Sequence, residues 1–318
     1  MQRVLVLRAL GLGDFLTGVP AMRALRRAFP EHEIVLGVPS ALEPLVSLSG
    51  VADTVLDTGG LEPVAWSGEP PELAVNLHGR GPESHRLLAA LAPRRLVAFG
   101  SPEEGHDGPS WTSDEHEVRR WCRLVESSLG LRADPAELHL EVPTTPPLVP
   151  DAVVVHPGAA YPARRWPCER FAQVARRACE RGHTVVVTGG PDETGLAEEV
   201  RRGAGLPSSA VLAGRTDLVG LAALVASARL VVCGDTGMAH LASAYSTPSV
   251  VLFGPTSPSR WGPPAGGPHV VLWHGDGTGD PWGGSPDPAL LRIGVEEVLG
   301  HVEELPQVTR ARTTPSSA

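Results

Sequence analysis

Lysine is missing from this chain of 318 residues, so all 27 basic residues are arginine. The net charge at pH 7 is −9, and such an acidic balance argues against a surface built mainly to bind nucleic acid. Alanine, glycine and proline are abundant, and together with the lack of lysine this indicates the codon bias of a GC-rich genome. An arginine at any one position is therefore weaker evidence of function than usual.

Cysteines and long apolar runs are also scarce. The four cysteines show no C-x-x-C pair and no metal-ligand spacing, which argues against a zinc site or a disulfide framework. Arg8 and Asp14 interrupt the N-terminal apolar run, so it does not resemble a signal peptide. The longest apolar stretch, Leu218–Cys233, falls short of the ~20 residues of a membrane span. We expect a soluble, cytoplasmic protein with no transmembrane segment, for which peripheral membrane contact stays open.

Short apolar runs alternate with amphipathic helical patterns, which is typical of α/β folds with parallel sheets. The first half contains predicted strands at residues 4–7, 34–37, 54–56, 74–76 and 96–98. Apolar residues recur at helical spacing from about Phe15 to Phe29, and a second helix is predicted over Asp114–Leu129. The first half therefore predicts one Rossmann-like domain.

The proline-dense stretch Val142–Pro150 cannot continue a helix or a central strand, and it predicts an interdomain linker. The alternation then restarts, with strands at 152–155, 184–188, 230–233 and 249–253, and helices at 169–181, from about 192, 218–228, 237–245 and 290–302. Residues 275–288 are predicted to form a loop. We expect domains over 1–145 and 150–304, followed by a disordered tail, 305–318.

The first candidate site is the strand-to-helix turn Arg8–Asp14. Its glycines allow a ligand to approach the backbone, and a helix N-terminus offers unpaired N–H groups. The turn does not match the dinucleotide fingerprint G-x-G-x-x-G, because Leu16 takes the place of the third glycine. Asp14 has two interpretations: a helix cap, or a general base that the helix N-terminus would keep ionised.

The second candidate site is the loop that follows the strand ending near His156. Arg164 and Arg165 lie side by side in it, and guanidinium groups pair with phosphate oxygens in a bidentate manner. They could therefore clamp a diphosphate, although a solvated basic pair explains the sequence equally well. Trp166 is expected to pack at the entry of the next helix.

The third and sharpest candidate is the turn Gly234–Ala242. A strand, a glycine turn and a helix start follow one another, which suits a diphosphate bound without a metal ion. Asp235 could accept hydrogen bonds from sugar hydroxyls, and His240 either faces the site or is a core histidine. The amides expected to converge here belong to Thr236, Gly237 and Met238. No Asp-x-Asp motif occurs, so we predict that arginine and helix N-termini replace a divalent ion.

These segments resemble the ADP-heptose:lipopolysaccharide heptosyltransferase family, glycosyltransferase family 9. The matching pieces are R-x-x-G-L-G-D-x-L-x-x-x-P-A-x-R-A-L at 8–25, H-P-G-A…R-x-W-P-x-E-x-F-A at 156–172, G-D-T-G-M-A-H-L-A at 234–242 and F-G-P-T-S-P-x-R at 253–260. They follow in the family's order and are jointly specific. The resemblance implies the GT-B fold, in which two Rossmann-like domains with parallel sheets face each other across a cleft.

The motifs and the resemblance together assign the expected site residues. Asp14 would be the catalytic base, and the N-terminal domain would bind the acceptor through Gly13, His78 and Arg80. The C-terminal domain would bind the nucleotide-sugar donor through Arg164, Arg165, Asp235, Thr236, Gly237, Met238, His240, Thr256 and Arg260. The chain departs from the family at Ala159-Ala160, at the loop Asn76–Arg80 and in Trp273–Pro288, which lacks the cysteines of many relatives.

The expected function is inverting, metal-independent transfer of a sugar, with heptose from ADP-heptose as the preferred donor. The acceptor would be a hydroxyl of a glycan, a lipid-linked glycan or a small molecule. We expect no cofactor besides the nucleotide sugar, and no nucleic-acid partner. Two alternatives stay open: a sugar-nucleotide epimerase of the same fold, and a catalytically silent nucleotide-binding protein.

Overall fold

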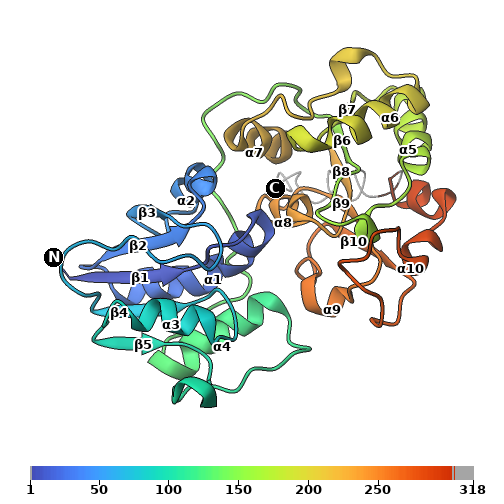
Figure 1. The fold of residues 1–318 in the computed structure, drawn as a ribbon. Coiled ribbons are helices and arrows are strands. Elements are labelled where there is room, and N and C mark those ends of the chain that lie inside the picture. Colours follow the sequence, from blue (N-terminus) through green and yellow to red (C-terminus); the bar gives the residue numbers. More distant parts are fainter. Residues whose placement is uncertain (1, 303, 305–318) are drawn as a thin grey trace, which may run out of the picture. The chain divides into compact units, whose positions relative to one another are not determined.

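The computed structural model describes residues 2–302 and residue 304, and the chain divides into two compact units. Unit 1 comprises residues 1–141 and unit 2 comprises residues 142–318. Each unit contains one five-stranded parallel sheet (Figure 1). Residues 142–150 form neither helix nor strand. The tail predicted to be disordered, 305–318, lies outside the described residues.

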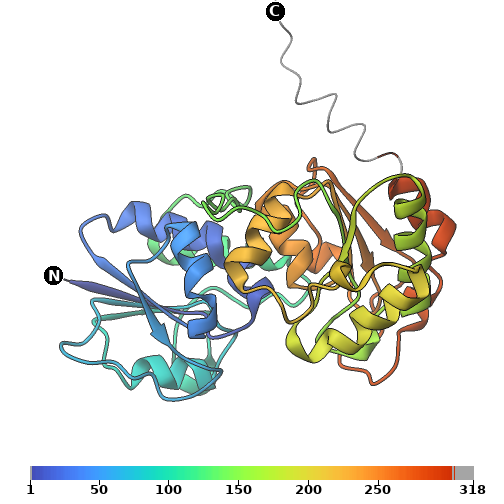
Figure 2. The ribbon, with the colours of Figure 1, turned by 90° about the horizontal axis from the view of Figure 1, so that it is seen from above.

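The sheet of unit 1 has the strand order β3-β2-β1-β4-β5 (Figure 1). Its strands are β1 (Arg3–Leu7), β2 (Glu33–Val38), β3 (Thr54–Asp57), β4 (Leu73–Asn76) and β5 (Arg95–Val97). Helices cover both faces (Figure 2). Central strands therefore contain continuous apolar runs, and the four residues from Val4 to Leu7 are all fully buried.

The described part of unit 1 contains four α-helices. They are α1 (Leu12–Ala28), α2 (Glu43–Ser49), α3 (Glu83–Ala89) and α4 (Glu117–Leu129). The helix predicted from Asp114 starts three residues later, because the His116 side chain accepts the Val118 N–H as an N-cap. Helices were expected between the strands, but the short α2 and α3 have too few turns for a clear period, and their bounds were not predicted.

The sheet of unit 2 has the order β10-β9-β8-β6-β7. Its strands are β6 (Val153–His156), β7 (Val185–Val187), β8 (Leu230–Gly234), β9 (Ser249–Phe253) and β10 (His269–Trp273). The main helices are α5 (Cys168–Glu180), α6 (Thr194–Ala204), α7 (Leu218–Ser227) and α8 (Gly237–Ala244), with the short α9 (Pro258–Trp261) and α10 (Pro288–Leu291). The predicted helix 290–302 is divided: α10 ends before Gly294, and residues 295–302 are helical again.

Both sheets have a topological switch point, where the chain crosses from one side of the first strand of the sheet to the other. In unit 1 it lies between β1 and β4, whose ends pair Leu7 with Asn76. In unit 2 it lies between β6 and β8, where His156 pairs with Cys233. Ligands of open α/β sheets bind outside the carboxyl ends of the strands at such points. The predicted motifs follow β1, β6 and β8, so the topology gathers them at these two places.

Candidate active site

Arg8 is the centre of the polar group at the switch point of unit 1. It follows β1 and is fully buried. Its Nε donates to the backbone oxygen of Asp14 at 2.8 Å, and Nη1 donates to the Leu77 carbonyl. Its Nη2 donates to Thr17 Oγ1 and to Glu117 Oε1, both at 3.1 Å. Every nitrogen of this guanidinium therefore serves a protein oxygen, a role that the motif alone did not reveal.

Asp14 lies in the first turn of α1, three residues after the N-cap. Gly11 is the N-cap, so the interpretation of Asp14 as the cap itself is wrong. Its Oδ1 is 3.6 Å from Arg8 Nη2, and 32% of the side chain is exposed. Burial raises the pKa of Asp14 and the Glu117 charge adds to this, while Arg8 and the backbone N–H groups of Gly11 and Asp14 oppose it.

This result corrects the expectation that the helix N-terminus dominates at Asp14. The N–H groups do favour the ionised form, but desolvation is the larger effect and leaves the carboxylate more basic than an ordinary aspartate. A general base works best when its pKa approaches the operating pH. The observed direction therefore suits proton acceptance.

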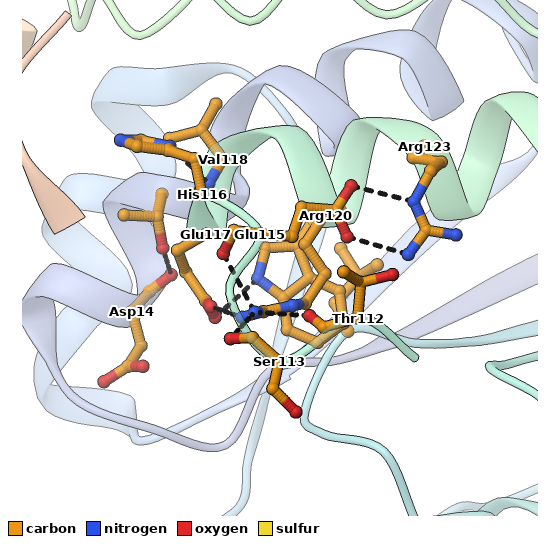
Figure 3. Close-up of polar contacts among 12 residues, drawn as sticks. Asp14, Thr112, Ser113, Glu115, His116, Glu117, Val118, Arg120 and Arg123 are labelled. Atoms are coloured by element: carbon orange, nitrogen blue, oxygen red, sulfur yellow. Dashed lines mark hydrogen bonds and ion pairs between the residues drawn. The ribbon is translucent and has the colours of Figure 1, made fainter. Parts of the chain in front are cut away.

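Glu117 and Arg120 extend the polar group along the start of α4, as Figure 3 shows. Both side chains are buried, and Glu117 Oε2 accepts a hydrogen bond from Arg120 Nη1. Glu117 Oε1 also accepts from Trp121 Nε1 at 2.8 Å. The Trp121 ring lies under the Arg8 guanidinium, 4.5 Å from its carbon to the ring centroid. None of these α4 residues lies in a sequence motif that pointed to the site.

His78, an expected acceptor-side residue, lies close enough to Arg8 for that charge to act on its imidazole. It follows β4, and its N–H donates to Asn76 Oδ1 at 3.0 Å. Burial lowers the pKa of His78 and the Arg8 charge lowers it further, which favours a neutral imidazole. Its buried Nδ1 has no hydrogen-bond partner among the described residues. Gly13 is half-buried and Arg80 is exposed, and their expected contact with an acceptor stays a prediction.

In unit 2, the loop carrying Arg164 packs directly on the turn after β8. A Cβ on Gly234 would lie 2.9 Å from the Arg164 carbonyl oxygen, so this position needs glycine. The adjacent Ala163 N–H donates to Gly283 O at 3.0 Å, and its carbonyl accepts from the Asp287 N–H at 3.2 Å. The second and third predicted motifs are therefore joined, and the loop 275–288 holds them from the other side.

The two adjacent arginines of this loop differ in their bonding. Arg164 Nε is buried and has no hydrogen-bond partner within the described part of the chain. Arg165 Nε donates to the Ala159 carbonyl at 2.9 Å and so braces the loop. The predicted clamp thus has one arginine with an unused donor and one already serving its own backbone.

Asp235 follows β8 and is only 6% exposed. Burial raises its pKa to about 6, and the positive charge of Arg164 limits the rise. Thr236 is the N-cap of α8, and its Oγ1 accepts the Met238 N–H at 3.1 Å. The expectation that three amides stand ready for a ligand needs correction, because this cap already uses the Met238 amide.

The remaining donor-side residues lie around α8 and α9. His240 is half-buried and packs edge-on against Trp261, with ring centroids 5.9 Å apart. This contact places α9, which carries the exposed Arg260, beside α8. Thr256 is half-buried just before α9.

Trp166 packs in the core, as predicted. It is buried, it meets Phe171 edge-on, and its Nε1 donates to the Ile293 carbonyl at 3.2 Å. Within residues 2–302 and 304, no three His, Cys, Asp or Glu side chains form a group that could hold a metal ion. Over the same residues, no helix is both long and apolar enough to cross a membrane.

The two parallel sheets, each with its switch-point site, define a protein of the GT-B fold. A model of glycosyltransferase family 9 (heptosyltransferase) matches residues 108–275, which is more than half of the 318 residues. The chain therefore belongs to glycosyltransferase family 9, as the motifs predicted.

Several relatives are similar to this chain in sequence. Lipopolysaccharide heptosyltransferase 1 of Pseudomonas aeruginosa is 40% identical over 223 residues, which cover 66% of this chain and 56% of that protein. Lipopolysaccharide heptosyltransferase 2 of Escherichia coli K12 is 26% identical over 296 residues, covering 81% and 84%. The match thus spans little more than half the length of the Pseudomonas relative.

Solved structures confirm the fold. The glycosyl transferase family 9 structure from Veillonella parvula superposes with a TM-score of 0.80 at 22% identity, covering 96% of this chain and 98% of that one. ADP-heptose lps heptosyltransferase II of E. coli superposes with a TM-score of 0.78 at 20% identity, covering 98% and 100%. At such identities the superposition shows a shared fold alone.

Proposed function

We propose that this chain transfers a sugar from a nucleoside diphosphate donor to a hydroxyl of a glycan or small molecule. Heptose from ADP-heptose is the preferred donor, because the relatives from Pseudomonas and E. coli are named heptosyltransferases. The observation that carries the proposal is the packing of the Arg164 loop on Gly234. It puts the charge of Arg164 beside Asp235, at the start of α8, with a buried Nε that no described residue uses.

On the donor side, Arg164 would pair with the diphosphate as negative charge develops on it. A guanidinium and a helix N-terminus can stabilise this charge without a divalent ion, so metal independence is part of the proposal. Asp235 would accept a hydrogen bond from a hydroxyl of the sugar. Arg165 would act indirectly, by holding the shape of the loop through its bond to Ala159.

On the acceptor side, Asp14 would take the proton of the acceptor hydroxyl as its oxygen attacks the anomeric carbon. The bond from that carbon to the diphosphate oxygen breaks in the same step, and the nucleoside diphosphate leaves with the electron pair. One displacement of this kind inverts the configuration at the anomeric carbon. The raised pKa of Asp14 makes it a better proton acceptor than an ordinary aspartate.

The acceptor class is proposed from the relatives' names, which refer to lipopolysaccharide. A lipid-linked glycan is therefore the first acceptor to test, followed by free glycans and small hydroxyl compounds. A lipid-linked acceptor would require transient contact with a membrane surface.

Calorimetric titration with ADP, GDP, UDP, dTDP and NAD, each with and without EDTA, tests the donor site. We expect selective binding of ADP that EDTA does not change. Preference for another diphosphate would move the donor assignment, and loss of binding in EDTA would contradict metal independence. A folded sample that binds none of the five would overturn the proposal. Release of ADP from ADP-heptose, dependent on a lipopolysaccharide core acceptor, then tests transfer.

A further inference from the structure

Two carboxylates share one nitrogen of the buried Arg8. Glu117 Oε1 accepts a hydrogen bond from Nη2 at 3.1 Å, whereas Asp14 Oδ1 lies at 3.6 Å from the same atom. The shorter contact thus belongs to the residue that is buried, and the longer one to the residue that is partly exposed. Of the two carboxylates, Glu117 is the closer partner of Arg8 Nη2, and Asp14 keeps only a looser ion pair.

The protein fixes Glu117 on every side. Arg120 Nη1 donates to Oε2, and Trp121 Nε1 donates to Oε1 at 2.8 Å. Arg120 is itself anchored, because its Nη2 donates to the backbone carbonyls of Thr112, Ser113 and Glu115. Figure 3 shows this group at the start of α4, with the Asp14 carboxylate pointing away from it. A carboxylate held so firmly is not placed to move during a reaction.

We propose that Glu117 is a positioning residue for Asp14: it holds Arg8 back from that carboxylate and so leaves it able to accept a proton. The proposal rests on the assignment of Asp14 as the base. Without Glu117, Arg8 Nη2 would lose its hydrogen-bonded carboxylate and would pair more closely with Asp14. The same change would remove a negative charge that now repels the ionised form of Asp14. Both effects make Asp14 a weaker base.

Two further titratable groups, Arg120 and His78, lie near Arg8 and Glu117. Arg120 balances Glu117, so the neutral sum of Arg8, Arg120, Glu117 and ionised Asp14 becomes positive when Glu117 is neutralised. His78 approaches Arg8 and favours its neutral form, so it adds no charge at neutral pH. In a Glu117→Gln variant this positive sum favours the ionised form of Asp14. Closer pairing with Arg8 favours the same form, so both effects lower the basicity of Asp14.

The test compares Glu117→Gln with the control Glu115→Gln. Glu115 loses the same charge two residues away, but its carboxylate pairs with Arg123 instead of Arg8. Carbon-13 NMR of aspartate carboxyls gives the titration midpoint of Asp14, whose signal is identified by its absence in Asp14→Asn. We expect the midpoint to fall in Glu117→Gln and to stay at the wild-type value in Glu115→Gln.

Steady-state transfer gives a second readout. In Glu117→Gln we expect the acidic limb of the kcat profile to move to lower pH, and kcat to fall roughly 3- to 10-fold, against the ~10²–10⁴-fold worth of a general base. KM for the donor should not change. A folded Glu117→Gln with the Asp14 midpoint unmoved would overturn the proposal. If the wild type has no transferase activity but the Asp14 midpoint still falls in Glu117→Gln, the proposed function is rejected. The effect of Glu117 on Asp14 would then stand by itself.

Loss of a buried carboxylate between two arginines could prevent folding, so Glu117→Asp is the second variant. It keeps the charge and withdraws the carboxylate from Arg8 by one methylene. We expect a smaller shift of the Asp14 midpoint in the same direction, with kcat between wild type and Glu117→Gln. An unchanged midpoint in this variant would overturn the proposal on its own.

Discussion

Each unit places an aspartate and an arginine at the switch point of its sheet, but the two pairs are built in opposite ways. In unit 1 the arginine is fixed: Arg8 is fully buried, and each of its nitrogens donates to a protein oxygen. The aspartate beside it, Asp14, is about one third exposed. In unit 2 the aspartate is the buried member: Asp235 is 6% exposed, and Arg164 keeps an Nε that nothing in the described chain accepts from.

This difference separates a cation whose nitrogens all serve the fold from a cation with a buried, unused donor. The Arg8 guanidinium is fully buried and already donates four hydrogen bonds to protein oxygens, so its contribution is to the fold and to the state of Asp14. Arg164 has a buried donor that remains costly until something accepts from it. Arginine is the only strong cation that this lysine-free sequence offers, so only the structure tells the two kinds apart.

The largest effect is expected from Asp14→Asn. The amide keeps the size of the side chain but cannot take a proton, so transfer should fall by about 10²–10⁴-fold, the usual worth of a general base. Donor affinity should stay at the wild-type value, because Asp14 belongs to unit 1 and the donor residues to unit 2. Product release and calorimetry measure the two quantities. If the variant still transfers the sugar, Asp14 is not the general base and serves only the first turn of α1.

Arg8→Met should cost about 3–5 kcal/mol of unfolding free energy, because it leaves the buried Glu117 without its partner cation. Chemical denaturation followed by tryptophan fluorescence measures the change. Trp121, which lies beside Arg8, contributes to this signal. Arg164→Met is the matched control, and we expect it to change stability by less than about 1 kcal/mol. Equal losses in both variants would erase the distinction between the two arginines.

Arg164→Met should instead weaken binding of the nucleoside diphosphate by about 10- to 100-fold, which corresponds to one charge-assisted hydrogen-bonding group. Arg165→Met is the comparison, since Arg165 Nε already donates to Ala159. We expect a smaller loss there, arising from a less rigid loop. A larger loss in Arg165→Met than in Arg164→Met would reverse the assignment within the pair.

The fold was predictable wherever burial imposed a clear pattern. Strand β9 was predicted residue for residue as 249–253, because a strand buried on both faces is a continuous apolar run. Strand β10 was missed, because it lies at the sheet edge and most of its residues are only half-buried. The bounds of two-turn helices such as α2 could not be predicted, because so few residues give no clear period.

The site was predictable in its motifs and not in its long-range partners. Asp14 and Asp235 stand in local strand-to-helix patterns that the sequence displays. Glu117 does not, because its partner Arg8 is 109 residues away and only the packing of α4 beside α1 brings them together. The raised pKa of Asp14 was missed for a related reason: the helix N-terminus is visible in sequence, whereas the desolvation that outweighs it is not.

The smallest effect is expected from Asp235→Asn, and it concerns stability. The pKa of Asp235 is about 6 in the folded chain against 3.8 for the ordinary side chain. Between these values the folded state binds more protons than the unfolded state, so stability falls as pH rises through about 6. At about pH 8 the asparagine removes this penalty, and we expect a gain of about 2 kcal/mol.

The pH dependence of that gain is the sharper test of the comparison. At about pH 4.5 the carboxyl group is largely protonated in the folded state, so most of the gain from Asp235→Asn should disappear. Asp192→Asn, at an exposed position, should change stability little at either pH. Because the variant would also lose the proposed contact of Asp235 with the donor sugar, we expect it to be more stable and less active. A gain that is independent of pH would mean that burial does not penalise the Asp235 charge, and the contrast with Asp14 would then rest on Arg8 and Arg164 alone.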